Sequence, residues 1–209
     1  WGEPERVKAM DGDDSCLRVM SLDMTYFEAG GKSYVSWADK TQENLSKVFI
    51  ATVDPEDPTQ LTSHATVITS PEYSWESVNI PVNEGSAAFV KDGTVYLAFS
   101  AAATGAEYCV GLMTADADAD LTDASNWTKV PYPVLTSGDF NDELCGPGHN
   151  SFTYDEYGNL VIVYHARPAA EHAGHSGDPL YDACRHAYVK PVLFDSEGAP
   201  VLNLSDEEF

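Results

Sequence analysis

A hairpin-like unit recurs three times along this chain, and this repeat limits the possible folds more than any other feature of the sequence. The turn glycines of the three copies are Gly31, Gly93 and Gly158, which lie 62 and 65 residues apart. Around each glycine, two runs of β-branched and aromatic residues flank a short polar turn, as TYFEA and KSYVSW do in the first copy. Such a pattern predicts a β-hairpin in every copy.

Further apolar runs follow each hairpin. A third run comes after a variable loop in every copy, and it reads KVFIATV, YCVGLMT and HAYVKPVLF. A fourth strand is expected at HATVIT, WTKVPYPVL and APVLNL. Units of three or four antiparallel strands, repeated with a period longer than that of most solenoids, are typical of β-propeller blades. Barrel or sandwich strands would also alternate, but they would not explain a recurring unit.

Composition agrees with a single all-β domain. The chain has 209 residues, of which 43% are hydrophobic and 11% aromatic, so it can bury a sizeable core. Only DLTDASNW has a pattern that would allow a short helical turn. No apolar run approaches the length of a membrane span, and no signal peptide is recognised at the start of the sequence.

The charge of the chain argues against two classes of partner. There are 34 acidic residues against 11 basic ones, which gives a net charge of −23. A field of this sign repels nucleic acids and anionic membrane surfaces, so neither is expected as a partner. The stretch DADADL begins like a calcium-binding loop, but Leu121 and Trp127 stand where such a loop needs Gly and Glu. The acidic stretches are therefore predicted to be solvated loops.

Each copy of the repeat opens with an ionisable residue: Asp23 in SLDMTYF, Glu84 in NEGSAAF and His149 in GHNSFTY. The innermost strand of a blade lines the central channel, so residues at equivalent early positions face a common axis. We therefore expect these three side chains to meet. One carboxyl group of a pair can stay protonated and donate a proton while the other stays ionised and orients it, which is the chemistry of sugar hydrolysis. Side chains from the loops would suit sugar rings and hydroxyl groups: Trp75, Tyr108, Phe140, Tyr181 and Arg185.

A purely structural explanation exists for each of the three residues. Asp23 could bond turn amides at the start of a strand, Glu84 could belong to a turn, and His149 could be an ordinary loop histidine. In that case the chain would be a structural all-β module, and the three side chains would diverge in space.

Several segments resemble the family 43 glycoside hydrolases, particularly their α-L-arabinofuranosidase and β-xylosidase-like members. The segments include LDMTYFEAGGKSYVSWAD and GPGHNSFTYDEYGNLVIVYHARP, and they follow the family's order and spacing from about residue 20 onward. The resemblance implies a five-bladed β-propeller, of which this chain supplies about three blades. Within a single partial domain of residues 1–209, we expect blades at residues 20–80, 81–145 and 146–209, with residues 1–19 as the tail of a preceding blade.

The resemblance also implies a function and roles for named residues. It indicates an inverting hydrolase that cleaves terminal α-L-arabinofuranosyl or β-xylosyl linkages in plant-cell-wall oligosaccharides. Glu84 matches the family's general acid, and Asp23 matches the residue that modulates the acid's pKa. Arg185, in ACRHA, matches an arginine that approaches the sugar, and Trp75 is expected to bind substrate as well. His149 matches a histidine near the axis that helps to hold a hydrated cation, often calcium, although the chemistry itself requires no cofactor.

Departures from the family pattern limit what this chain can do alone. Ser86 replaces a usual proline, and Asp182, Ala183 and Cys184 replace a usual Asp-Pro-Asn before Arg185. The general base, an Asp expected two blades upstream, is absent. Three blades would also leave two open sheet edges. We therefore predict that missing N-terminal blades or a second chain complete the propeller, and that this chain alone is inactive.

Two questions stay open at this point. The alternative to an enzyme is a non-catalytic carbohydrate-binding propeller, or a remnant of one. Acidic, sugar-directed proteins can be secreted or can act on imported oligosaccharides, so both a secreted and a cytoplasmic location stay open, with a slight preference for an extracellular one.

Overall fold

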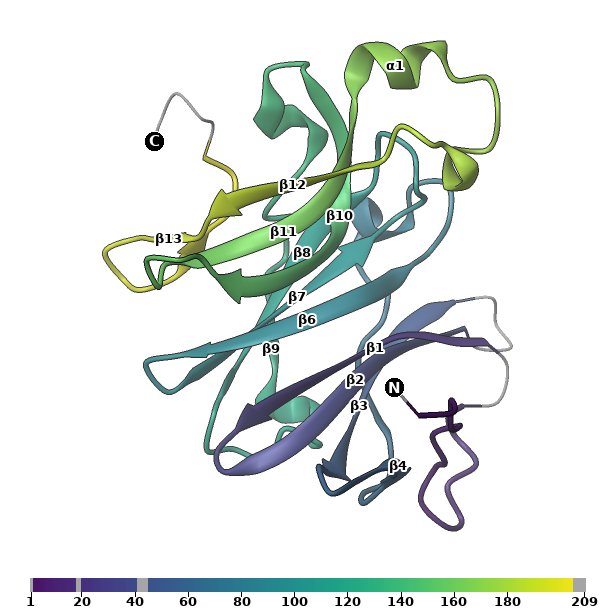
Figure 1. The fold of residues 1–209 in the computed structure, drawn as a ribbon, viewed down its shortest axis with the longest axis vertical. Coiled ribbons are helices and arrows are strands. Elements are labelled where there is room, and N and C mark those ends of the chain that lie inside the picture. The colour runs from purple at the N-terminus through teal and green to yellow at the C-terminus, as the bar shows by residue number, and fades with distance from the viewer. Residues whose placement is uncertain (1, 18–19, 41–44, 205–209) are drawn as a thin grey trace.

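Three antiparallel sheets follow one another along the chain and stack along the long axis of the molecule (Figure 1). The structure is a computed structural model, and it describes residues 2–17, 20–40 and 45–204. The predicted tail of residues 1–19 and the predicted third blade therefore lie partly outside the described residues. Within the described ranges, no helix has the length and apolar character that crossing a membrane would need.

The first two sheets contain the strands that the repeat predicts, and the first has an additional strand, β4, that was not predicted. In the first sheet, strands pair in the order β1-β2-β3-β4, and β5 pairs with β3. Its strands are β1 (Met20–Ala29), β2 (Lys32–Lys40), β3 (Ser46–Asp54), β4 (Asp57–Leu61) and β5 (Thr66–Thr69). The second sheet has the order β6-β7-β8-β9. Its strands are β6 (Asn83–Lys91), β7 (Thr94–Ala101), β8 (Cys109–Asp116) and β9 (Thr128–Lys129).

The third sheet has three strands in the order β10-β11-β12. They are β10 (Leu144–Tyr154), β11 (Leu160–Pro168) and β12 (His186–Pro191). The predicted fourth strand in APVLNL is wrong for this sheet, because β14 (Pro200–Val201) pairs with β13 (Leu193–Phe194) as a separate hairpin. Short helical segments lie in the connections: η1 (Ser74–Ser77), η2 (Ala124–Asn126), η3 (Ser137–Phe140), α1 (Ala169–Gly174) and η4 (Pro179–Tyr181). The helical turn expected in DLTDASNW is confirmed as η2.

Apolar side chains fill the space between successive sheets. In β3, Val48 and Ile50 pack in the cluster between the first and second sheets, whereas Phe49 and Ala51 pack on the opposite face. A strand with both faces buried has a continuous rather than an alternating apolar run, which explains KVFIATV. A second cluster, between the second and third sheets, includes Ala98 of β7.

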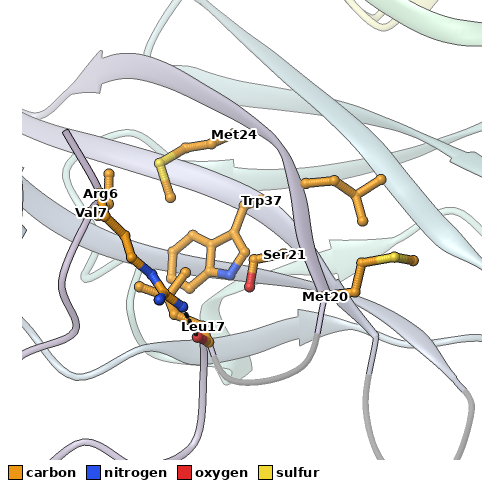
Figure 2. Close-up of a pocket in the computed structure, with 8 residues that line it drawn as sticks. Arg6, Val7, Leu17, Met20, Ser21, Met24 and Trp37 are labelled. Carbon is orange, nitrogen blue, oxygen red and sulfur yellow. Dashed lines mark hydrogen bonds between the residues drawn. The ribbon is translucent and has the colours of Figure 1, made fainter. Parts of the chain in front are cut away.

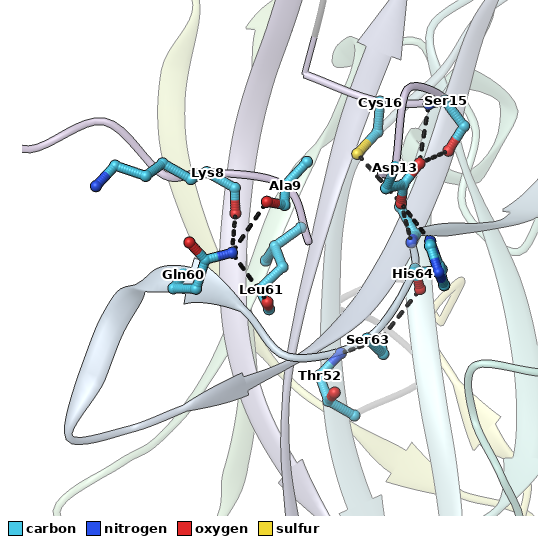
Figure 3. Close-up of polar contacts among 11 residues, drawn as sticks. Lys8, Ala9, Asp13, Ser15, Cys16, Thr52, Gln60, Leu61, Ser63 and His64 are labelled. Carbon is cyan, nitrogen blue, oxygen red and sulfur yellow. Dashed lines mark hydrogen bonds and ion pairs between the residues drawn. The ribbon is translucent and has the colours of Figure 1, made fainter. Parts of the chain in front are cut away.

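The segment before β1 lies against β4 and the loop that follows it (Figure 3). Lys8 forms a parallel bridge with Gln60, whose side-chain nitrogen donates to the Ala9 carbonyl at 2.9 Å. Asp13 accepts the Ala65 N–H at 2.7 Å, and its carboxylate lies 3.6 Å from His64 Nδ1. Asp13 therefore fastens this segment to the sheet.

The outward face of the first sheet carries a hollow of about 510 Å³ (Figure 2). Trp37 forms part of its lining, with Met20 and Met24 beside it. Both methionines are exposed, by 50% and 37%, which is unusual for side chains that cover a tryptophan. The Trp37 Nε1 atom is buried and has no hydrogen-bond partner among the described residues.

Candidate functional site

The first strand of each of the three sheets carries a bulge, and the three bulges build the site. These inner strands are β1, β6 and β10. Strand β6 lies against both β1 and β10. The regular pairing of each strand with its neighbour breaks at the bulge. There Asp23, Gly85 and His149 adopt left-handed backbone, with φ angles of 59°, 56° and 48°. Left-handed backbone is uncommon in residues with a side chain, and such strain clusters at functional sites.

This register corrects one expectation from the sequence. The structural equivalent of Asp23 and His149 is Gly85, so Glu84 lies one position earlier, opposite Ser100. The offset between Asp23 and Glu84 shows in the sequence, because Asp23 precedes Trp37 by 14 positions and Glu84 precedes Phe99 by 15. His149 also precedes its aromatic residue, Tyr164, by 15 positions, which makes it look equivalent to Glu84. The connection between β10 and β11 is longer, however, than the connection between β6 and β7.

Asp23 nevertheless joins the other two inner strands. Its Oδ2 accepts the Gly85 N–H at 3.2 Å, and its Oδ1 lies 3.6 Å from His149 Nε2. A Cβ atom on Gly85 would lie only 3.3 Å from the His149 ring, so a glycine suits both the backbone angle and the close approach. The structure thus brings Asp23 and His149 together beside Glu84, as predicted, and not into the diverging arrangement that a purely structural module would have.

Glu84 is a carboxyl group suited to hold a proton. Its Oε1 accepts a hydrogen bond from the Tyr108 hydroxyl at 2.7 Å. Burial raises the pKa of Glu84 above its ordinary value of 4.5, and the negative charge of Asp23 raises it further. The Tyr108 hydrogen bond and the charges of His149 and Arg185 act in the opposite direction but do not cancel the rise. A raised pKa is what a general acid needs near neutral pH.

Arg185 belongs to the same electrostatic environment. It is partly exposed, and its Nη2 donates to the Leu180 carbonyl at 2.6 Å. Its charge lowers the pKa of Glu84. Burial, followed by the charges of Arg185 and Arg167, lowers the pKa of His165 to about 4. His165 is therefore neutral near pH 7, and Arg185 lies close enough to the site to influence it.

The contacts of Trp75 are with the packed interior and not with Asp23, Glu84 or His149. It lies in η1, stacked at 6.2 Å between ring centroids on both Tyr73 and Phe99, and its Nε1 donates to the Pro131 carbonyl at 3.1 Å. The substrate role of Trp75 stays a prediction. Tyr108, expected as a surface for sugar rings, is only 1% exposed, so that expectation is wrong.

A buried ionic cluster that was not predicted from the sequence lies beside Glu84. Glu76 is fully buried, and its Oε1 lies 2.5 Å from Lys129 Nζ and accepts from Asn83 Nδ2 at 3.1 Å. Asn83 also accepts from the Thr69 hydroxyl at 2.8 Å. Because Asn83 immediately precedes Glu84, this cluster fixes the start of the strand that carries the acid.

The side chains around His149 do not make a calcium site by themselves. Across the ranges that the structure describes, no group of three or more His, Cys, Asp or Glu side chains is arranged to hold a metal ion. Calcium takes six to eight oxygen ligands, and the imidazole of His149 is a nitrogen donor. The hydrated cation expected beside His149 therefore stays a prediction.

The raised pKa of Glu84 predicts a pH dependence of stability. The folded state holds this proton more tightly than the unfolded state, so the stabilisation is complete below about pH 4.5 and is lost as pH rises through the folded pKa. Relative to Glu84→Gln, which stays neutral, the wild type should lose free energy of unfolding between about pH 4.5 and the folded pKa. Urea unfolding of both proteins from pH 4 to 7 measures this. Parallel stability curves would show that the pKa of Glu84 is not raised.

Known proteins resemble this chain over most of its length. The model of the family described as "Glycosyl hydrolases family 43" matches residues 1–200. An extracellular exo-alpha-(1->5)-L-arabinofuranosidase from Streptomyces avermitilis is 39% identical over 183 residues, which make up 86% of this chain and 37% of that protein. A protein of the same name from Streptomyces chartreusis is 41% identical over 177 residues, or 83% of this chain and 51% of that protein. The chain thus spans about half, or less, of the length of these curated relatives.

Solved structures show the same relationship. The crystal structure of an α-L-arabinofuranosidase from Lactobacillus brevis matches with a TM-score of 0.81 at 38% identity, over 90% of this chain and 57% of that one. A thermostable family-43 glycoside hydrolase matches with a TM-score of 0.68 at 21% identity, over 86% of this chain and 56% of that one, and this likeness shows the fold alone.

Proposed function

Because the chain belongs to glycoside hydrolase family 43 and forms part of a five-bladed β-propeller, we propose that the completed propeller hydrolyses terminal α-L-arabinofuranosyl linkages with inversion. Oligosaccharides of the plant cell wall are the proposed substrates. The observation that carries this proposal is the raised pKa of Glu84, a largely buried carboxyl group on which burial and the charge of Asp23 act in the same direction. The names of the curated relatives favour arabinofuranosides over β-xylosides.

The mechanism is a single displacement. Protonated Glu84 donates its proton to the leaving oxygen as the glycosidic bond breaks. A carboxylate general base draws a proton from a water molecule, which attacks the anomeric carbon from the opposite face. In inverting glycosidases the two carboxyl groups lie about 6.5–9.5 Å apart, which leaves room for that water. The charge of Asp23 helps to keep Glu84 protonated. The proposed role of Arg185 is to bind sugar hydroxyl groups.

The general base would come from blades that this chain does not supply. The hollow on the outward face of the first sheet supports this, because exposed Met20 and Met24 cover Trp37 there (Figure 2). A neighbouring blade would bury these side chains and could provide an acceptor for Trp37 Nε1. We propose that the rest of a longer polypeptide, or a second chain, packs on this face, and that the 209-residue chain alone is inactive.

The proposed place of action is outside the cell. Both Streptomyces relatives are named extracellular, and arabinose-containing wall oligosaccharides would be met there. A cation near His149 would need oxygen ligands from the missing blades or from water, and it stays a prediction.

Hydrolysis of 4-nitrophenyl α-L-arabinofuranoside and 4-nitrophenyl β-D-xyloside tests the proposal. The assay compares this chain with the full-length product of its gene. We expect the full-length protein to prefer the arabinofuranoside, and NMR of the first product to show inverted configuration, while this chain shows no turnover. Retained configuration would contradict the mechanism. Sugar binding without hydrolysis by the full-length protein would instead support the non-catalytic carbohydrate-binding propeller.

A further inference from the structure

The orientation of Glu84 depends on a tyrosine that has no surface for substrate. Tyr108 is 1% exposed, and its hydroxyl donates to Glu84 Oε1 at 2.7 Å. Its ring stacks in parallel on the His165 ring, with 5.4 Å between the centroids. Gly148, which pairs with His165 across the sheet, leaves room for this ring, because a Cβ atom there would overlap Tyr108. The stacking on His165 and the space at Gly148 fix the Tyr108 ring, and the ring in turn holds the hydroxyl beside Glu84.

The hydrogen bonds that end at Glu84 have a fixed direction. The backbone N–H of His149 can only donate, and it donates to Ser100 Oγ at 2.6 Å. The Ser100 hydroxyl is then free to give its own hydrogen to Tyr108, and this bond opposes the rise in the Tyr108 pKa. Tyr108 in turn gives its hydrogen to Glu84. Each bond in such a chain strengthens the next, and every donor points toward the carboxyl group.

A carboxyl group that accepts on one oxygen carries its proton on the other. We propose that Tyr108 is a positioning residue that reserves Glu84 Oε1 as an acceptor and so places the acid proton on Oε2. This inference rests on the proposed function. After Oε2 has given its proton to the leaving oxygen, the bond from Tyr108 stabilises the resulting carboxylate. Burial raises the pKa of Tyr108 well above 10, so the hydroxyl stays a donor throughout and does not supply the proton itself.

Tyr108→Phe tests this role, since it removes the hydroxyl and keeps the ring. The charged groups that act on Glu84 are Asp23, His149 and Arg185, and all of them remain in the variant. In the wild type, the hydrogen bond from Tyr108 lowers the pKa of Glu84. Its loss should therefore move the titration midpoint of Glu84 to higher pH. Carboxyl ¹³C NMR of the 209-residue chain measures this, with the Glu84 signal identified by its absence in Glu84→Gln. The measurement requires no activity, so it stands even if the proposed function fails.

Tyr96→Phe is the matched control. Tyr96 lies in the same sheet, and its hydroxyl donates to the Gly198 carbonyl at 3.0 Å, so the variant loses a comparable bond elsewhere. The Glu84 midpoint should not move in this control. If Tyr108→Phe does not fold, Ser100→Ala removes the preceding donor and should shift the midpoint upward by less. An unchanged or lower midpoint in a folded Tyr108→Phe or Ser100→Ala protein would overturn the proposal, and so would an equal shift in Tyr96→Phe.

The full-length enzyme offers a second readout. There Tyr108→Phe should lower kcat about tenfold on arabinosides with poor leaving groups, leave KM nearly unchanged, and move the basic limb of the pH profile upward. A purely structural role would lower activity without moving that limb. A fall in kcat with an unmoved limb would therefore contradict the positioning role.

Discussion

Glu84→Gln should reduce kcat of the full-length enzyme on natural arabinosides by about 10²–10⁴-fold, the usual contribution of a general acid. Gln cannot donate a proton to the leaving oxygen, although it keeps an oxygen that can accept from Tyr108. Substrates with good leaving groups, such as dinitrophenyl arabinofuranosides, need little protonation and should lose far less. Steady-state kinetics with a series of aryl arabinofuranosides measures this dependence on the leaving group.

Glu156→Gln provides the matched control for this prediction. Glu156 is an exposed glutamate in the connection between β10 and β11, so the same change should leave kcat unaltered. Equal losses on natural and activated substrates in Glu84→Gln would mean that Glu84 does not act as the acid. In that case the raised pKa of Glu84 would report its burial alone.

Features that depend on local sequence could be predicted well. The three hairpins follow from runs of strand-forming residues around a short turn, as at Gly31 and Gly93, and each of them is confirmed. The apolar run KVFIATV was expected as a third strand and forms β3, although the burial of both its faces was not predicted. Short helical segments such as α1 were not predicted, because a few residues carry too weak a periodic signal.

The details of the site depend on contacts that sequence spacing does not reveal. The left-handed backbone at Gly85, which identifies this glycine and not Glu84 as the equivalent of Asp23 and His149, is encoded by no apolar pattern. Tyr108 could be recognised as a strand-start aromatic, but its bond to Glu84 requires the space left by Gly148, some 40 residues later in the chain. Each of these features needs a tertiary contact between different strands.

The cluster around Glu76 was not predicted because it, too, depends on tertiary contacts and not on local sequence. A fully buried carboxylate is costly unless its oxygens are satisfied, and here they are. Oε2 accepts the backbone N–H groups of Glu72 and Tyr73 at 2.7 Å each, while Oε1 faces Lys129 and Asn83. Its members come from η1, β6 and β9, so they meet only in the folded chain. The cluster links the stability of the second sheet to the position of Glu84.

Lys129→Met should therefore lower the free energy of unfolding by about 3–5 kcal/mol, the usual cost of leaving one partner of a buried ion pair uncompensated. The Lys129 side chain is only 9% exposed, and its Nζ also donates to the Ser70 carbonyl at 2.8 Å. Met fills a similar volume but cannot replace the charge or the hydrogen bonds. Urea unfolding of the 209-residue chain, with the slope m compared between variants, measures the loss.

Two further variants show whether the unpaired charge is the cause. Lys91→Met removes a lysine from a solvent-exposed pair with Asp92, and its stability should stay close to that of the wild type. The double variant Glu76→Gln, Lys129→Met removes both charges and should be more stable than Lys129→Met alone, because no buried carboxylate is left without its cation. If the double variant is the least stable of the three, the loss comes from packing and hydrogen bonds, and the uncompensated charge of Glu76 is not its main cause.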